Sequence, residues 1–478
     1  PPPHTHISLI FFIIYIYIYI YLIMKYLSTL ITFLFGNVNI LLLLLFIHVK
    51  QIIATPDNMP EKISTNLIPN FYHSTHEILN KLHELANNNE CKGGTTIKIE
   101  KHGEMPSLTT LLFQNNNNNK NDAQIKKKAF FLFGEHAREL ISPETALRMA
   151  EDLCMLHEES KNEAMNVLSH SEVFMVPIAN PLGRLSVEKG NTCQRVNENG
   201  VDMNRNWDSH WLADEDSFGS DTYPGKKAFS EPEVRTLKSL VDSYKPSMFV
   251  TVHSGTLGMY TPYAYSTDIP HDDPNDLSNM VNIINKLNPD YCQCPSGPAG
   301  KEVGYLCPGT CLDYAYDIGK TKYSFAFEIF ASDADEIHRK FKEKQQQTLL
   351  EVGTLRYGHD HDHHHEHDDH HHHNHDHGHH NKGPEYSCFL QTAEESSASI
   401  LNQLSPEDCV GYFNPITKDD YERTKQKWSE AFLKMINMAH GAQTQSLKSM
   451  LPPDAVAAPA KNAIEAQLRG NIPGKLQM

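Results

Sequence analysis

An apolar run that ends at a glycine and leads into a helix constrains this fold more than any other feature of the chain. Residues 130–133 form a continuous apolar run of the kind that makes a buried strand, and Gly134 ends it. Ser142 and Pro143 then predict the N-cap and first turn of a helix over 142–156. Because a strand passes into a helix here, the polar turn between them should lie at the carboxyl edge of a sheet, where open α/β sheets bind ligands.

Strands and helices alternate along most of the chain. Apolar or alternating runs predict the strands, and apolar residues at helical spacing predict the helices between them. This order predicts an α/β fold, a single domain with a mixed, mostly parallel β-sheet flanked by helices. The expected strands lie at 95–99, 108–113, 130–133, 173–178, 247–252 and 323–330, and the expected helices at 71–86, 142–156, 231–244 and 419–440.

The polar turn after Gly134 carries two residues of the types that bind zinc. His136 offers a neutral imidazole nitrogen, and Glu139 offers a carboxylate. Alone, a His-x-x-Glu pair is a weak signal, because such pairs usually lie on a solvated face. The pair becomes informative only if the chain also supplies a third ligand, a base and a group that binds anions.

Candidates for those roles follow later in the chain. His253 comes directly after a predicted strand, and a turn-rich segment before it holds Arg195 and Arg205. In the strand predicted at 323–330, alternation places Glu328 on the face opposite three apolar side chains, beside small residues. A carboxylate on such a strand is costly to bury unless it has a partner or a chemical role.

Together these motifs resemble the zinc metallocarboxypeptidases of the carboxypeptidase A type. The resemblance covers 71–440 apart from a histidine-rich insertion, and the order and approximate spacing of the motifs also match. The motifs are Gly-Glu-His-Ala-Arg-Glu at 134–139, Arg-Val-Asn at 195–197, Gly-Val-Asp-Met-Asn-Arg-Asn-Trp at 200–207, Thr-Val-His-Ser at 251–254 and Tyr-Ser-Phe-Ala-Phe-Glu at 323–328.

The resemblance implies a catalytic site and an activity. One Zn²⁺ per chain would be held by His136, Glu139 and His253, which leaves a fourth position for water. Glu328 would be the general base for the zinc-activated water, and Arg195 would stabilise the oxyanion. The implied reaction is hydrolysis of the C-terminal peptide bond of peptides or proteins. The alternative for Glu328 is a carboxylate that is ion-paired within the sheet.

The same resemblance implies the substrate-binding residues. Asn204 and Arg205 would hold the terminal carboxylate of the substrate, because a planar guanidinium binds carboxylate bidentately. Arg138 would help in the adjacent pocket, and Tyr305 matches the tyrosine that closes over the substrate. Leu312 falls at the pocket floor, where an acidic residue suits Lys and Arg; leucine there predicts apolar or aromatic C-terminal residues.

The chain departs from the family pattern in two respects. Gly255 stands where many relatives have a tyrosine, so one contact in a secondary subsite differs. The interval between the leader and the first predicted helix is too short for a typical folded pro-domain, so we expect the enzyme to be made in active form.

The ends of the chain predict targeting rather than chemistry. Residues 1–54 are rich in apolar and tyrosine runs and are interpreted as a leader, with Met24 as a candidate start. A secretory signal peptide is favoured, which implies an extracellular or a vacuolar or lysosomal location, and a membrane anchor is the alternative. Residues 55–70 are expected to be a linker, and 441–478 a flexible tail.

Residues 359–380 differ in kind from the remainder, since fourteen of these 22 residues are histidine and six are acidic. No packed core can form from them, so we expect a disordered insertion at about 357–383. The tract could bind additional divalent metals, or it could be neutral. Its acidic residues contribute to a net charge of −17, which argues against nucleic acid as a partner. We expect a monomer.

Nine cysteines are an odd number, so at least one thiol stays free or pairs between chains. Four of them, at 292, 294, 307 and 311, are spaced for either zinc or disulfide bonds, and in a secreted protein disulfides are favoured. Three rival functions stay open: a catalytically inactive protein that keeps the fold, a metal-sequestering protein that uses the histidine tract, and an amidase for non-peptide acyl substrates.

Overall fold

The structure, a computed structural model, describes residues 62–63, 65–87, 91–103, 106–115, 126–268, 274–333, 335 and 404–441. The predicted leader, half of the predicted linker, the histidine-rich insertion and all of the predicted tail except Gly441 lie outside these residues. None of the described helices combines the length and the apolar composition that a bilayer crossing requires.

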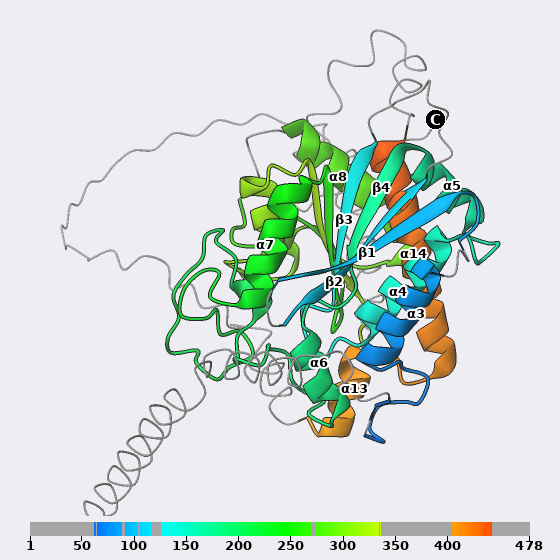
Figure 1. Cartoon of the computed structure of the whole chain (residues 1–478). Coiled ribbons are helices and arrows are strands. Elements are labelled where there is room, and N and C mark those ends of the chain that lie inside the picture. The colour runs from blue at the N-terminus through cyan, green and yellow to red at the C-terminus, as the bar shows by residue number, and fades with distance from the viewer. Residues whose placement is uncertain are drawn as a thin grey trace, which may run out of the picture. The chain divides into compact units, whose positions relative to one another are not determined.

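A mixed sheet organises the described residues (Figure 1). Its strands are β1 (Thr95–His102), β2 (Leu108–Asn115), β3 (Lys127–Phe133), β4 (Ser171–Val176), β5 (Met248–His253), β6 (Leu257–Thr261), β7 (Ser296–Pro298) and β8 (Tyr323–Ile329), and they lie in the order β1-β2-β4-β3-β5-β8-β6-β7. The pairs β3–β4, β3–β5, β5–β8 and β6–β7 are parallel, and the pairs β1–β2, β2–β4 and β6–β8 are antiparallel. The predicted α/β fold with a mixed, mostly parallel sheet is confirmed.

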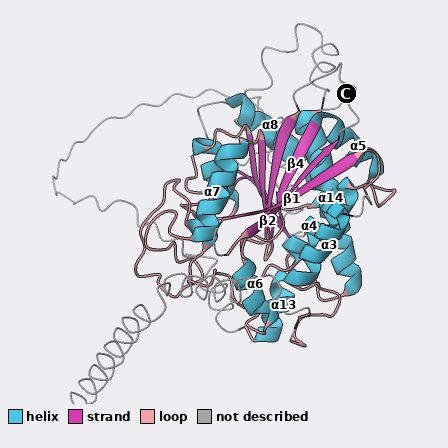
Figure 2. Cartoon of the chain, viewed as in Figure 1, coloured by secondary structure: helices cyan, strands magenta, loops and turns pink. Residues whose placement is uncertain are grey.

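Helices cover both faces of this sheet (Figure 2). Side chains that alternate along β3 divide between the two faces: Phe131 and Phe133 join one apolar cluster, and Phe130 and Leu132 join another. The first cluster also holds residues of α3 (Thr75–Asn87), α4 (Ile141–Leu153), α5 (Lys161–His170), α8 (Pro274–Tyr291) and α14 (Lys418–His440), and the second holds residues of α7 (Pro232–Tyr244). Burial on both faces explains the continuous apolar run at 130–133.

The shorter helical segments lie in the connections. They are α6 (Pro181–Glu188), η2 (Met203–Arg205), α9 (Ala299–Glu302), α10 (Cys311–Asp313), η3 (Tyr314–Ile318) and α13 (Pro406–Phe413). The elements that were not predicted are α5, α6, α8, α9, α10, α13, η2, η3, β6 and β7. Ile68, near the end of the predicted linker, is buried in the first apolar cluster, so part of that segment contributes to the core.

The predicted N-cap at Ser142 is wrong. Helix α4 begins at Ile141 with Leu140 at the N-cap position. The Ser142 hydroxyl instead donates to the Val252 carbonyl at 2.7 Å and accepts from the Gly134 amide at 3.1 Å. The hydroxyl therefore fastens the turn after β3 to the end of β5, which is a tertiary contact that local sequence does not reveal.

Three disulfide bonds join described cysteines, Cys91 to Cys154, Cys193 to Cys409 and Cys292 to Cys294. Of the four closely spaced cysteines, Cys292 and Cys294 pair with each other, whereas Cys307 and Cys311 are buried and form no disulfide bond with a described cysteine. Among the described residues, the one group of His, Cys, Asp or Glu side chains arranged to hold a metal ion lies elsewhere.

Candidate functional site

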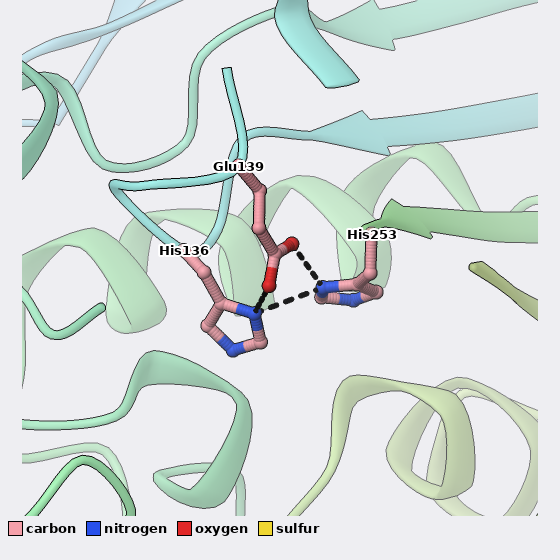
Figure 3. Close-up of side chains that lie close together, drawn as sticks. All are labelled: His136, Glu139 and His253. Atoms are coloured by element: carbon pink, nitrogen blue, oxygen red, sulfur yellow. Dashed lines mark hydrogen bonds and ion pairs between the residues drawn. The ribbon is translucent and has the colours of Figure 1, made fainter. Parts of the chain in front are cut away.

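That group consists of His136, Glu139 and His253 (Figure 3). The Nδ1 atom of His136 lies 2.7 Å from Glu139 Oε1, and the Nδ1 atom of His253 lies 3.1 Å from His136 Nδ1 and 3.2 Å from Glu139 Oε2. All three side chains are buried, and their donor atoms lie within 4.8 Å of one another. Residues far apart in the chain thus meet at one point.

Strand pairing brings these residues together. Strands β3 and β5 are parallel neighbours with Phe133 opposite Val252, so the turn after β3 meets the end of β5. Gly134 shapes that turn with a φ of +67°, and a Cβ atom there would meet Pro143 Cγ at 2.9 Å. A residue with a side chain would be strained at this position, so glycine is required for the turn that presents His136.

The donor set suits zinc. Two imidazole nitrogens and one carboxylate make a three-ligand set of the kind found at catalytic zinc sites. Although burial raises the pKa of Glu139, its contacts with His136 and His253 outweigh burial and lower that pKa, which keeps the carboxylate ionised. The other ring nitrogen of His136, Nε2, lies 3.2 Å from Asp202 Oδ1, so Nδ1 stays available as a ligand.

Glu328 stands beside this group on the neighbouring strand. It pairs with His253 across the parallel strands β5 and β8. Its Oε2 atom is buried and has no hydrogen-bond partner among the described residues. Burial and the negative charge of Glu139 raise the pKa of Glu328 to about 8. The carboxyl group is therefore suited to exchange a proton near neutral pH.

Arg195 and Asp202 form a charged pair next to the three candidate ligands. The Nη2 atom of Arg195 lies 3.0 Å from Asp202 Oδ2, and Nη1 lies 3.6 Å from Glu139 Oε1. Burial raises the pKa of Asp202, but the charges of Arg195 and His136 outweigh burial and hold it well below its usual range. Asp202 was not predicted as a site residue, although it lies inside the motif at 200–207.

The residues expected to bind the substrate carboxylate lie in η2. The side-chain oxygen of Asn204 accepts from the Cys311 amide at 3.0 Å. Arg205 donates to the Asn204 carbonyl at 2.8 Å and to the Cys307 thiol at 3.1 Å. Because Cys307 shares a small apolar cluster with Leu312, the candidate carboxylate-binding and specificity residues are adjacent.

That small apolar cluster consists of Tyr260, Ala264, Ala299, Cys307 and Leu312. Leu312 is buried, and the half-buried Tyr305 packs against the cluster. Tyr305, which was predicted to close over the substrate, and Leu312, which was predicted at the pocket floor, therefore lie at one apolar surface.

Arg138 lies away from that cluster, against α13. Its guanidinium donates to the Cys193 carbonyl at 2.9 Å and lies 4.0 Å above the Phe413 ring. A Cβ atom at Gly255 would meet Phe413 Cδ1 at 2.7 Å. Phe413 thus fills the space beside Gly255, and nothing in the local sequence around 413 signals this contact.

Comparison with known proteins agrees with this geometry. A family model described as zinc carboxypeptidase matches residues 96–350. Carboxypeptidase A2 of Rattus norvegicus is 32% identical over 212 residues, which is 41% of this chain and 49% of the relative. Zinc carboxypeptidase A 1 of Drosophila melanogaster is 27% identical over 219 residues, 44% of this chain and 50% of the relative. The chain thus spans about half the length of these relatives.

Solved structures are similar as well. The crystal structure of thrombin activatable fibrinolysis inhibitor has a TM-score of 0.48 and 24% identity, with 56% of this chain and 70% of that chain covered.

The residues that the family model matches, 96–350, make up more than half of the 478 residues. The chain therefore belongs to the zinc carboxypeptidase family.

Proposed function

We propose that this protein is a zinc-dependent carboxypeptidase that hydrolyses the C-terminal peptide bond of peptides or proteins. The observation that carries the proposal is the meeting of His136, Glu139 and His253 at the carboxyl edge of the sheet, with Glu328 on the next strand. Membership of the family supports the same activity. When bound, Zn²⁺ supplies Lewis-acid chemistry and lowers the pKa of water.

Glu328 acts as the general base. Its buried Oε2 has no hydrogen-bond partner among the described residues, and its pKa is raised to about 8. The carboxylate takes a proton from the attacking water and passes it to the leaving amine. A pKa near neutral suits both transfers, because the group must accept a proton and then release it.

Arg195 supplies the positive charge for the oxyanion that develops as the carbonyl becomes tetrahedral. Its Nη1 atom already faces the candidate ligand Glu139 at 3.6 Å. Asp202 holds this arginine through a contact of 3.0 Å, so the guanidinium is in place before substrate arrives.

Asn204, Arg205 and Arg138 bind the substrate. Asn204 and Arg205 hold the free carboxylate, which restricts cleavage to the last peptide bond. Arg138 contributes to the adjacent substrate pocket. Tyr305 closes over the substrate carboxylate. Leu312 contacts the C-terminal side chain, and its apolar surroundings favour an apolar or aromatic residue.

We also propose that the protein follows the secretory route to the extracellular space, a vacuole or a lysosome. Three disulfide bonds within the described residues support this location, because disulfides persist in oxidising compartments. Additional divalent metals on the histidine tract, and a monomeric state, stay predictions from sequence.

The test is hydrolysis of matched peptides that differ in their last residue and in their terminus. The proposal expects release of a C-terminal Phe or Leu, loss of release when the terminal carboxylate is amidated, and loss with a chelator that zinc reverses. Equal cleavage of the amidated peptide, or activity that survives complete zinc removal, would contradict it. Cleavage of acyl amides alone would favour the amidase alternative.

A further inference from the structure

Glu135 is a buried carboxylate at the site, and it has no part in the proposed mechanism. It is 2% exposed and lies directly before the candidate ligand His136. Its Oε1 atom has no hydrogen-bond partner among the described residues. Its Oε2 atom accepts from the Thr251 hydroxyl at 2.9 Å and from the Cys311 thiol at 3.3 Å.

A carboxylate in this position needs a positive partner. Burying an ionised group without one is strongly unfavourable, and a hydroxyl and a thiol compensate only part of that cost. Beside Glu135 lies the imidazole of His253, whose Nε2 atom is 3.5 Å from Glu135 Oε2. The Nδ1 atom of the same ring belongs to the candidate metal centre, so Glu135 lies on the far side of His253 from the metal.

Thr251 lies between these two groups. It precedes His253 by two positions on β5, so both side chains are on the same face of the sheet. Its Oγ1 atom lies 2.8 Å from His253 Nε2 as well as 2.9 Å from Glu135 Oε2. A hydroxyl has one proton, and an ionised carboxylate can only accept, so the Thr251 proton goes to Glu135.

The hydroxyl oxygen must then accept from His253. The proton on that ring is consequently on Nε2, and Nδ1 keeps the lone pair that faces Glu139 and His136. The Asn204 side-chain nitrogen also faces Nε2, but at 3.4 Å, a much weaker contact than the one at 2.8 Å. His136 shows the same arrangement in simpler form, since its Nε2 faces Asp202 directly.

We propose that Glu135 and Thr251 are positioning residues that hold His253 in the orientation and tautomer that bind zinc. The proposal rests on the proposed zinc site and deepens it. The relay runs from the carboxylate of Glu135 through the hydroxyl of Thr251 to the imidazole of His253. It links the turn that carries His136 to the strand that carries His253, so both histidine ligands are oriented by carboxylates.

The experiment measures zinc affinity by competition with a chelator, together with the thermal midpoint of the zinc-free full chain. Glu135→Gln and Thr251→Val should each weaken zinc binding by about 10- to 100-fold. Thr251→Ser keeps the hydroxyl and should bind zinc as the unmodified protein does. The double variant Glu135→Gln with Thr251→Val should bind zinc as tightly as the single variant with the lower zinc affinity. The two losses should not add, because both residues act through one relay.

Glu188→Gln is the matched control, because Glu188 is a buried carboxylate in α6 that contacts Thr75 and Arg184 instead of the metal site. It should leave zinc affinity unchanged whatever it does to the thermal midpoint. Unchanged zinc affinity in both Glu135→Gln and Thr251→Val would overturn the proposal. The proposal would also be overturned if the lower thermal midpoint of the zinc-free variants explained all of their loss of zinc affinity. That result would indicate a structural role only.

The experiment can still contradict the proposal if one variant does not fold, and it separates the relay from the proposed function. If Glu135→Gln does not fold, the contrast between Thr251→Val and Thr251→Ser tests the relay alone. Zinc affinity is measured without any substrate, so the relay and the proposed function fail separately. Variants that bind zinc in the expected order while the unmodified protein cleaves no peptide would support the relay and contradict the proposed function.

Discussion

His253 at the end of β5 pairs in register with Glu328 on the parallel strand β8. The candidate zinc ligand and the candidate base therefore come from the same level of the sheet. On its other side, β5 pairs with β3, whose following turn supplies His136 and Glu139. Three adjacent parallel strands thus bring four side chains together at their carboxyl ends, where α/β sheets form their sites.

Leu312→Asp should change the preference for the C-terminal residue. Leu312 is buried in an apolar cluster, and a carboxylate there would favour a cationic side chain and disfavour an apolar one. We expect the ratio of kcat/KM for C-terminal Phe over C-terminal Lys to fall by about 100-fold or more. Leu312→Ile, which keeps the apolar character, should leave the ratio within a few-fold. An unchanged ratio in a zinc-loaded Leu312→Asp enzyme would contradict this assignment.

Removal of the Cys193–Cys409 disulfide should weaken both stability and substrate binding. The bond ties α13 to the segment before Arg195, and Phe413 at the end of α13 packs on Arg138. The variant with Ser at both positions should lose about 2–4 kcal/mol of unfolding free energy in urea. Its KM should also rise, because Arg138 loses part of its support.

The control is the variant with Ser at Cys292 and Cys294. That bond closes a separation of only two residues, and no contact that the structure gives for these cysteines reaches the site. Its loss should cost less stability and leave KM unchanged. Equal effects of the two double variants on KM would show that α13 does not support the site.

His440 should make stability depend on pH. The ring lies between the hydroxyls of Ser171 and Ser247, each 3.0 Å away. Burial, assisted by the charge of Lys127, lowers the pKa of His440 from 6.5 to about 3. The folded state therefore keeps the ring neutral while the unfolded chain takes up a proton below pH 6.5. The stabilisation is complete above pH 6.5 and is lost progressively as the pH falls towards 3.

The magnitude of this loss should be on the order of 4 kcal/mol between pH 7 and pH 3. Urea unfolding at several pH values checks it, with His440→Gln as the comparison. The variant cannot titrate at this position, so its stability should fall less steeply with acid. Equal slopes for the two proteins would show that His440 does not cause the pH dependence.

Much of this architecture could be predicted from the sequence because local patterns determine it. The continuous apolar run at 130–133 reflects burial on both faces of β3. His136 and Glu139 follow a strand and His253 ends one, and the carboxyl ends of parallel strands meet at one edge. The proximity of residues at such positions can be predicted from the sequence without knowledge of the packing.

The remaining features depend on contacts between distant segments. Phe413 fills the space at Gly255 from a helix that follows the long insertion. Cysteine spacing does not determine pairing, so the partner of Cys193 could not be predicted. Helix α8 contains Pro289, which disfavours a helix strongly, and several asparagines, whose helix propensity is low. Its apolar packing in the first cluster outweighs those preferences.

Ser142 illustrates the same limit within a single turn. Its type and its position before proline predict an N-cap, yet its hydroxyl bonds the Val252 carbonyl. Glu135 is a second example, because its role depends on Thr251 far along the chain.

The most direct test of the account is the activity and zinc content of Glu328→Gln. The substitution keeps the shape of the side chain and removes its ability to accept a proton. The account predicts one zinc per chain, as in the unmodified protein, with kcat lowered by about 10²- to 10⁴-fold. In contrast, His253→Ala should lose both zinc and activity. A zinc-loaded Glu328→Gln enzyme that keeps kcat within a few-fold of the unmodified protein would contradict the account.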